Sequence, residues 1–236
     1  MTGELLFGDC RERLPRLAAA SVDLIVTDPP YNTGMSAGGT RLRHFFDDSM
    51  SRDDYRQLAR EVSVQLFRVL KPNRGAYVFI GWKSLAVWLD AMSESGFRVK
   101  NVIVWDKIVH GLNYQNYAYT HELLIFAVKG TFRPRNHTPP DDSYRDVWHV
   151  RRTMNNARSD RAHHETVKPW EVIRRPIEHA SEVGDLVLDP FVGSGTTCVV
   201  AKTLGRRYIG MERDADYFRV ALRRVHQIAA PPGVPA

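Results

Sequence analysis

The chain has 236 residues, of which 43% are hydrophobic and 25% charged, which suits one α/β domain or a domain with an insertion and excludes global disorder. Its 33 Lys and Arg exceed its 27 Asp and Glu, so an acidic partner such as nucleic acid is compatible with its charge. No apolar run reaches the roughly 18 residues of a membrane helix, no signal region opens the chain, and Cys10 and Cys198 form no metal or redox motif. We expect a cytoplasmic, reduced protein without a metal site.

Short apolar runs alternate with helical patterns along the chain. The predicted strands cover residues 4–7, 22–27, 75–80, 98–105, 121–130, 185–190 and 206–212. The predicted helices cover residues 11–20, 55–69, 85–92, 169–181, 196–205 and 215–228, and KPNRG at 71–75 is expected to end the second of them. This alternation predicts an α/β fold with a mostly parallel, twisted sheet and helices on both faces.

The remaining residues carry few periodic apolar positions. Residues 130–165 are mostly polar and are expected to form an insertion or a surface region. The tail AAPPGVPA, residues 229–236, is expected to be a flexible end. Without repeats or low-complexity tracts, the sequence predicts a single domain over residues 1–236.

The first stretch with chemical character is TDPPYNTG, residues 27–34, which follows the apolar run VDLIVT. The prolines and glycine alone predict a turn. Asp28 and Tyr31, at the mouth of a sheet, could also hold a flat ring that forms hydrogen bonds. In parallel sheets ligands bind at the carboxyl ends of strands, which favours the second interpretation.

A second strand end carries DPFVGSGTT, residues 189–197. Gly193 and Gly195 let the backbone approach a ligand, and the helix that follows offers free N–H groups to an anionic end. The loop lacks the Lys of a P-loop, so ATP hydrolysis is not expected. One strand later Glu212 can accept hydrogen bonds from both ribose hydroxyls. A dinucleotide fits the same physics, but the loop is not G-x-G-x-x-G and a dinucleotide leaves DPPY unexplained.

TDPPYN and DPFVGSGTT together resemble the motifs of the S-adenosylmethionine-dependent, amino-methylating DNA methyltransferases. HHETVKPWEVI, residues 163–173, resembles the H-P-T-x-K-P segment of that family, although Glu165 stands where Pro is usual. GDC at 8–10 and WDK at 105–107 also fall where the family has related segments. The order, with DPPY before the glycine loop, is that of the β group. The resemblance spans nearly the whole chain and implies a Rossmann-like methyltransferase fold with permuted motif order.

This resemblance assigns the catalytic work to DPPY. Asp28 and the backbone carbonyl of Pro29 would accept hydrogen bonds from the amino group of a base flipped out of the duplex. Pro29 and Pro30 would keep the turn stiff, and Tyr31 would stack on the flipped ring. The rate would come from positioning and electrostatics, without a protein nucleophile, so neither cysteine would react.

The resemblance also implies S-adenosylmethionine as the cofactor. Glu212 would bind its ribose, Lys168 its carboxylate, and Asp9 and Cys10 would border its adenine ring. The full set expected to bind the cofactor is Asp9, Cys10, Asp28, Thr166, Lys168, Asp189, Pro190, Phe191, Gly193, Ser194, Gly195, Thr196, Thr197 and Glu212.

The expected macromolecular partner is double-stranded DNA. We expect residues 107–165 to contain the target-recognition insertion, because residues 151–164 hold four arginines and two histidines against one Asp. The arginines expected to contact DNA are Arg151, Arg152, Arg158 and Arg161. Such a short segment predicts a short target site or a homodimer, and a separate restriction endonuclease stays open as a partner.

Methylation of the adenine N6 amine is the expected reaction, because family members acting on cytosine N4 more often have Ser in place of Asp28. Four alternatives stay open: a cytosine N4 methyltransferase, an RNA or protein amino-group methyltransferase, an inactive DNA-binding relative, and a nicotinamide oxidoreductase. Transfer of methyl groups to DNA would separate the two DNA methyltransferases from the inactive relative and the oxidoreductase.

Overall fold

The predicted alternation of strands and helices builds one eight-stranded sheet in the order β1-β8-β7-β2-β3-β5-β4-β6. The computed structural model describes residues 3–32, 50–108, 117–135, 145–152 and 168–228. The strands are β1 (Glu4–Phe7), β2 (Val22–Thr27), β3 (Leu70–Ile80), β4 (Arg98–Asp106), β5 (His121–Lys129), β6 (Val147–His149), β7 (Leu186–Asp189) and β8 (Arg207–Glu212). Each predicted strand is confirmed, and β6 is an additional one.

All neighbouring strands in the sheet are parallel except where β5 is involved. β5 runs antiparallel to β3 on one side and to β4 on the other, while β4 and β6 are parallel. The carboxyl ends of the other strands therefore share one edge with the beginning of β5. The expected mostly parallel sheet is confirmed, and side chains from its separate strands converge at that edge.

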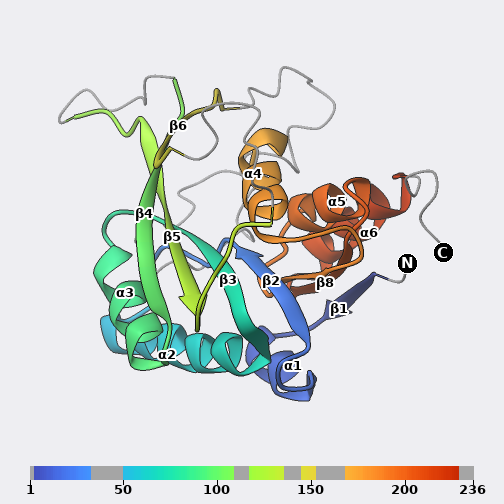
Figure 1. Cartoon of the computed structure of the whole chain (residues 1–236), viewed down its shortest axis with the longest axis horizontal. Helices are drawn as coiled ribbons and strands as arrows, with labels where there is room; N and C mark the ends of the chain where they lie inside the picture. The colour runs from blue at the N-terminus through green and yellow to red at the C-terminus, as the bar shows by residue number, and fades with distance from the viewer. Residues whose placement is uncertain (1–2, 33–49, 109–116, 136–144, 153–167, 229–236) are drawn as a thin grey trace.

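Helices cover both faces of the sheet, as Figure 1 shows. One face packs against α1 (Cys10–Arg13), the 3-10 helix Leu14–Arg16, α2 (Arg52–Val69) and α3 (Leu85–Glu94). The other face packs against α4 (Trp170–Ala180), α5 (Thr196–Thr203) and α6 (Ala215–His226). Successive strand residues face opposite sides, so Ile25 joins the first core and Leu24 the second.

The KPNRG segment differs from its prediction. α2 does end at Val69, but β3 begins directly at Leu70 and includes KPNRG. The reason is a cluster of ion pairs at this end of the sheet, where Lys71 and Arg74 each lie 2.8 Å from the buried carboxylate of Asp23. These contacts to β2 hold a polar stretch in a strand that local propensity would make a loop.

The strand order reverses between β2 and β7. From β2 the chain continues outward to β3, whereas β7 leads through β8 to β1 on the other side. A ligand crevice forms at such a switch point, outside the carboxyl ends of the strands. The two motifs DPPY and DPFVGSGTT follow these two strands, so the fold places them side by side. Within the described ranges, no helix combines the length and apolar character needed to cross a membrane.

Candidate functional site

Asp28 follows the last residue of β2, and its carboxylate is held on both oxygens. The hydroxyl of Tyr31 donates to Oδ1 at 2.6 Å, and the ammonium group of Lys168 lies 2.9 Å from Oδ2. The side chain of Asp28 keeps 32% of its surface exposed, against 12% for Lys168. The carboxylate therefore has a fixed orientation and still faces open space.

Lys168 precedes α4 and points into this site. Its ammonium group also lies 2.7 Å from Oε2 of Glu122, near the start of β5, and donates to the Tyr31 hydroxyl at 3.0 Å. Burial would lower the pKa of Lys168, but the carboxylates of Asp28 and Glu122 outweigh it and raise that pKa. Lys168 is thus held as a cation beside Asp28 in this structure, and its contact with the cofactor carboxylate stays a prediction.

The turn that carries Asp28 is held from two helices. The Tyr55 hydroxyl of α2 donates to the Pro30 carbonyl at 2.8 Å, and the Ser84 hydroxyl donates to the Tyr31 carbonyl. Among the described residues, none donates to the Pro29 carbonyl. That carbonyl is therefore one acceptor in the turn that a ligand can use.

The ring of Tyr31 packs closely against the backbone beyond β3. A Cβ atom added to Gly81 would lie 3.2 Å from the Tyr31 ring, and the Lys168 ammonium group lies 5.3 Å from the ring centroid. Burial, together with Asp28 and Glu122, raises the pKa of Tyr31 well above its ordinary value, so its hydroxyl stays protonated as a donor. Stacking of this ring on a flipped base stays a prediction.

Asp189 ends β7 and is 3% exposed. Its Oδ1 accepts hydrogen bonds from the Thr27 hydroxyl of β2 at 2.8 Å and from the Phe191 N–H at 3.1 Å. The Thr197 side chain also bonds to it. Burial raises the pKa of Asp189 to about 7 against these hydrogen bonds. Asp189 and Thr197 therefore join the two halves of the site from within, and Pro190 beside them is also buried.

Glu212 ends β8 beneath the glycine loop. Its two carboxylate oxygens accept from the Gly193 N–H at 2.9 Å and from the Asp214 N–H at 2.8 Å. Burial raises the pKa of Glu212 against these donors. Gly193 has φ +50°, and a Cβ atom added there would meet nothing within 4 Å. The loop is thus shaped by Glu212 and opens onto free space where a ligand can lie.

The outer part of the loop is tied to α6. Nη1 of Arg224 donates to the Ser194 carbonyl at 2.7 Å, to the Ser194 hydroxyl at 2.8 Å and to the Thr196 hydroxyl at 3.1 Å. Gly195, the residue before α5, has φ +90°, and a Cβ atom there would lie 3.0 Å from Ala221. These contacts fix the loop against α6 before any ligand binds.

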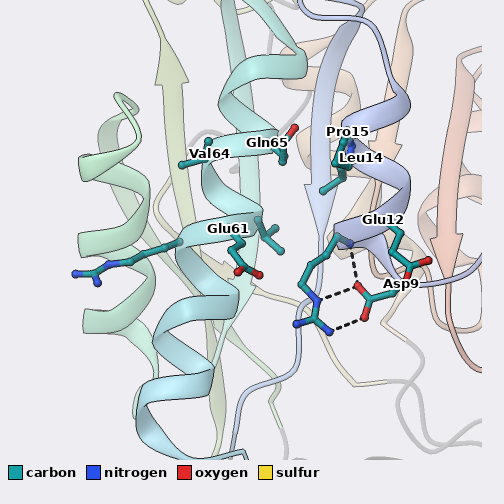
Figure 2. A pocket seen from close by; sticks show the side chains of 10 residues that line it. Asp9, Glu12, Leu14, Pro15, Glu61, Val64 and Gln65 are labelled. Carbon is teal, nitrogen blue, oxygen red and sulfur yellow. Dashed lines mark hydrogen bonds and ion pairs between the residues drawn. The ribbon is translucent and has the colours of Figure 1, made fainter.

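Asp9 and Cys10 lie beyond the end of β1, next to β8. The carboxylate of Asp9 caps α1 and pairs with Arg11 at 2.8 Å (Figure 2), and its hydrogen bond from Arg11 lowers its pKa. A groove of about 680 Å³ lies between α1 and α2. Asp9 lines this groove, and Cys10 is its neighbour in the chain. Cys10 is buried, and burial raises its pKa to about 12. Contact of either residue with an adenine ring stays a prediction.

Comparison with known proteins agrees with this geometry. Residues 22–223 match the N6_N4_Mtase family model, described as DNA methylase. The chain belongs to this family. Type II methyltransferase M.HpaI of Haemophilus parainfluenzae is 31% identical over 240 residues, covering 95% of this chain and 74% of the relative. M2.DpnII of Streptococcus pneumoniae is 30% identical over 238 residues, covering 94% and 88%.

A solved structure extends the likeness to three dimensions. TTHA0409 of Thermus thermophilus, crystallised in complex with S-adenosyl-L-methionine, superposes with a TM-score of 0.72 at 26% identity. The match covers 98% of this methylase and 96% of that chain. The Rossmann-like methyltransferase fold and the family expected from the motifs are thereby confirmed.

Some predicted residues of the methylase lie outside the described part of the chain. These are Thr166, Arg158 and Arg161, together with His163 and His164. Among the residues that are described, no three His, Cys, Asp or Glu side chains are grouped so that they could hold a metal ion. Arg151 and Arg152 are described and exposed, and only Val150 separates them from β6. The Arg152 N–H donates to the Lys107 carbonyl at 3.1 Å, which brings this pair to the catalytic edge of the sheet.

Three residues of the site were missed from the sequence. Glu122 bonds to Lys168 and Tyr31, Lys107 lies 2.6 Å from Glu122, and Arg224 holds the glycine loop. The available signal for Glu122 was a carboxylate at the start of the otherwise apolar run HELLIFAV. A charge in such a strand costs free energy unless it is paired, and this rule would have marked it.

Proposed function

We propose that this methylase transfers a methyl group from S-adenosylmethionine to the N6 amine of an adenine flipped out of double-stranded DNA. The observation that carries the proposal is the position of Asp28. It stands at the switch point of the sheet, next to the strand that leads into the glycine loop, with a fixed carboxylate that faces open space. Asp as the first residue of DPPY supports adenine over cytosine.

The residues present fit the cofactor. Gly193 opens onto free space, the α5 N-terminus offers N–H groups, and Glu212 lies under the loop. In the proposal, the glycine loop holds the methionine part and Glu212 the ribose. When bound, S-adenosylmethionine supplies an electrophilic methyl group on its sulfonium sulfur.

The chain's own contribution is to orient the amine. Asp28 and the Pro29 carbonyl accept its two N–H groups, which shifts electron density onto the nitrogen and aims the lone pair at the methyl group. After transfer the nitrogen releases one proton to Asp28, whose carboxylate faces open space and passes the proton to solvent. Lys168 stays protonated and, 2.9 Å from Asp28, holds that carboxylate in place. No covalent intermediate is required, and burial raises the pKa of both cysteines, which makes them poor nucleophiles.

The test is methyl transfer from labelled S-adenosylmethionine to unmodified genomic DNA, followed by nucleoside analysis. We expect N6-methyladenine. N4-methylcytosine would keep the mechanism and overturn the base assignment, and label in RNA alone would overturn the substrate. No transfer, with the cofactor still bound, would favour an inactive DNA-binding relative.

Asp28→Ala is expected to lower kcat by about 100-fold or more, because it removes an acceptor preorganised for the reacting amine. Affinity for S-adenosylmethionine, measured by calorimetry, should be largely retained. Asp90→Ala is the control, because Asp90 is exposed on α3 and should leave both values unchanged. An Asp28→Ala enzyme that methylates normally would show that the assigned mechanism is wrong.

We further propose that residues 107–165 contain the DNA-recognition region. β5 falls within this range but is not part of that region, because it is paired on both sides within the sheet. Arg151 and Arg152 would contact phosphates or guanine edges from the catalytic edge. Arg151→Ala with Arg152→Ala should weaken DNA binding and leave cofactor binding intact, and electrophoretic mobility shifts would measure the loss.

The cellular setting is also a proposal. The designation of M.HpaI and M2.DpnII as Type II methyltransferases supports a restriction-modification context and a cytoplasmic location. A separate endonuclease would then be the partner that cleaves unmodified DNA, and a second copy of the chain would supply the other half of the recognition surface. Sedimentation of the free protein and of its DNA complex tests the homodimer.

A further inference from the structure

Glu122 occupies a position where an ionised side chain is costly. β5 runs through the middle of the sheet, and the six residues that follow Glu122, from Leu123 to Val128, are buried. The Glu122 side chain is itself only 17% exposed. A carboxylate in such a place destabilises the fold unless opposite charges and hydrogen bonds compensate it.

The compensation comes from both sides of the catalytic turn. Oε1 of Glu122 lies 2.6 Å from the ammonium group of Lys107, which follows β4. Oε2 lies 2.7 Å from the ammonium group of Lys168 and 3.1 Å from the oxygen of the Tyr31 hydroxyl. With Asp28, the cluster holds two carboxylates and two ammonium groups, so its net charge is balanced.

The partners of Glu122 are the same groups that hold Asp28. Tyr31 donates to Asp28 Oδ1 at 2.6 Å, and Lys168 lies 2.9 Å from Oδ2. We propose that Glu122 is a positioning residue for amino-group methylation: it fixes Lys168 and the Tyr31 hydroxyl, and these fix the Asp28 carboxylate toward the amine. This inference rests on the proposed function, in which Asp28 accepts from that amine.

Another role for Glu122 would be to take up the proton that the amine loses, relayed from Asp28 through the Tyr31 hydroxyl. Burial would raise the pKa of Glu122, but Lys168 and Lys107 outweigh burial and lower that pKa to about 2. A carboxylate that acidic releases a proton at neutral pH and does not store one. The contacts of Glu122 with Lys168 and Lys107 therefore favour a positioning role over proton uptake. Asp106, beside Lys107, is paired elsewhere, with His149 at 2.9 Å.

The test uses Glu122→Gln in the full chain. This change keeps the shape and removes the charge, so Lys168 loses one of the carboxylates that hold it. We expect kcat for DNA methylation to fall about 10- to 100-fold, as for a misplaced catalytic group, with KM for S-adenosylmethionine unchanged. Glu122→Asp, which restores the charge, should recover part of the rate.

The pH profile of kcat separates positioning from mere support of the fold. Glu122 helps to raise the pKa of Lys168, so in Glu122→Gln the ammonium group loses its proton at lower pH. The alkaline limb of the profile should therefore move to lower pH. Glu94→Gln is the matched control, because Glu94 is exposed and pairs only with Arg60, at 3.1 Å, among the described residues.

Lys107→Met provides a second test if Glu122→Gln does not fold. It removes one cation from Glu122 and leaves the partners of Asp28 in place. Without that cation the pKa of Glu122 should rise, so the acid limb of the pH profile of kcat should move to higher pH. A Glu122→Gln enzyme with wild-type kcat and pH profile would overturn the role of Glu122. A wild-type enzyme that forms no N6-methyladenine would instead overturn the proposed function.

Discussion

Gly195 shows how one backbone angle fixes the approach of the cofactor loop to α6. Its φ of +90° belongs to the left-handed region, and a Cβ atom there would lie 3.0 Å from both Cα and Cβ of Ala221. A side chain at this position would meet two obstacles, the backbone conformation and the neighbouring helix. The residue is therefore required by geometry, independently of any ligand.

Gly195→Ala should lower the free energy of unfolding by more than the roughly 1–2 kcal/mol that left-handed backbone costs an L-residue, and it should weaken cofactor binding. Gly184→Ala is a matched control, because Gly184 also has φ +90° but a Cβ atom there meets nothing within 4 Å. Urea denaturation of both variants isolates the packing contribution. Equal losses would show that contact with Ala221 is unimportant.

At the scale of elements, α6 supports the cofactor loop without carrying a motif residue. It begins at the cap of Asp214, whose side chain accepts from the N–H groups of Asp216 and Tyr217, both at 2.9 Å. In its last turn, Arg224 reaches back to the loop. Burial lowers the pKa of Arg224, which marks a guanidinium group largely withdrawn from water.

Arg224→Met should weaken S-adenosylmethionine binding about 10-fold, because hydrogen bonds from a charged donor contribute about 1.5–3 kcal/mol. The loop would lose its tie to α6, while Asp28 and its partners stay in place, so kcat at saturating cofactor should change less. Calorimetric titration measures the affinity. Arg223→Met, which alters an exposed neighbour, should have no effect, and equal affinity in all three proteins would contradict the role of Arg224.

Elements with a strong local pattern were predictable from the sequence. α2 repeats apolar residues at helical spacing, and β2 and β5 are nearly continuous apolar runs. β6 was missed because three residues, Val147–His149, are too few to show a period. It exists because it pairs with β4 and buries Trp148 in the core, and these contacts are distant in sequence.

At the scale of the whole molecule, the same distinction explains the site. DPPY and the glycine loop are contiguous motifs, so their place at strand ends followed from the alternation of elements, and the fold shows that these strands, β2 and β7, are neighbours. Glu122 and Arg224 act through partners far along the chain, and a motif cannot show such a partner. Lys168 belongs to a motif, yet only the fold shows that it lies against Asp28, 2.9 Å away. What sequence reasoning lacked was the set of contacts between elements.

Asp189 makes the free energy of unfolding of the whole molecule depend on pH. It lies at the centre of the sheet, between β2 and the glycine loop. Its pKa is raised by burial from an ordinary 3.8 to about 7. Between these values the folded chain holds a proton that the unfolded chain has lost. The free energy of unfolding contributed by this group therefore falls as pH rises from about 4 to about 7, by at most about 1.4 kcal/mol per pH unit.

Asp189→Asn removes this titration and keeps the side-chain shape. Other buried carboxylates contribute their own slopes, so the informative quantity is the difference between wild type and variant across pH 4 to 7, the interval between the ordinary and raised pKa values of Asp189. Relative to Asp189→Asn, the wild-type protein should lose stability as pH rises, as followed by urea denaturation at each pH. Asp90→Asn, an exposed site, should run parallel to wild type. If Asp189→Asn also ran parallel, Asp189 would be ionised throughout, held by the donors from Thr27, Phe191 and Thr197.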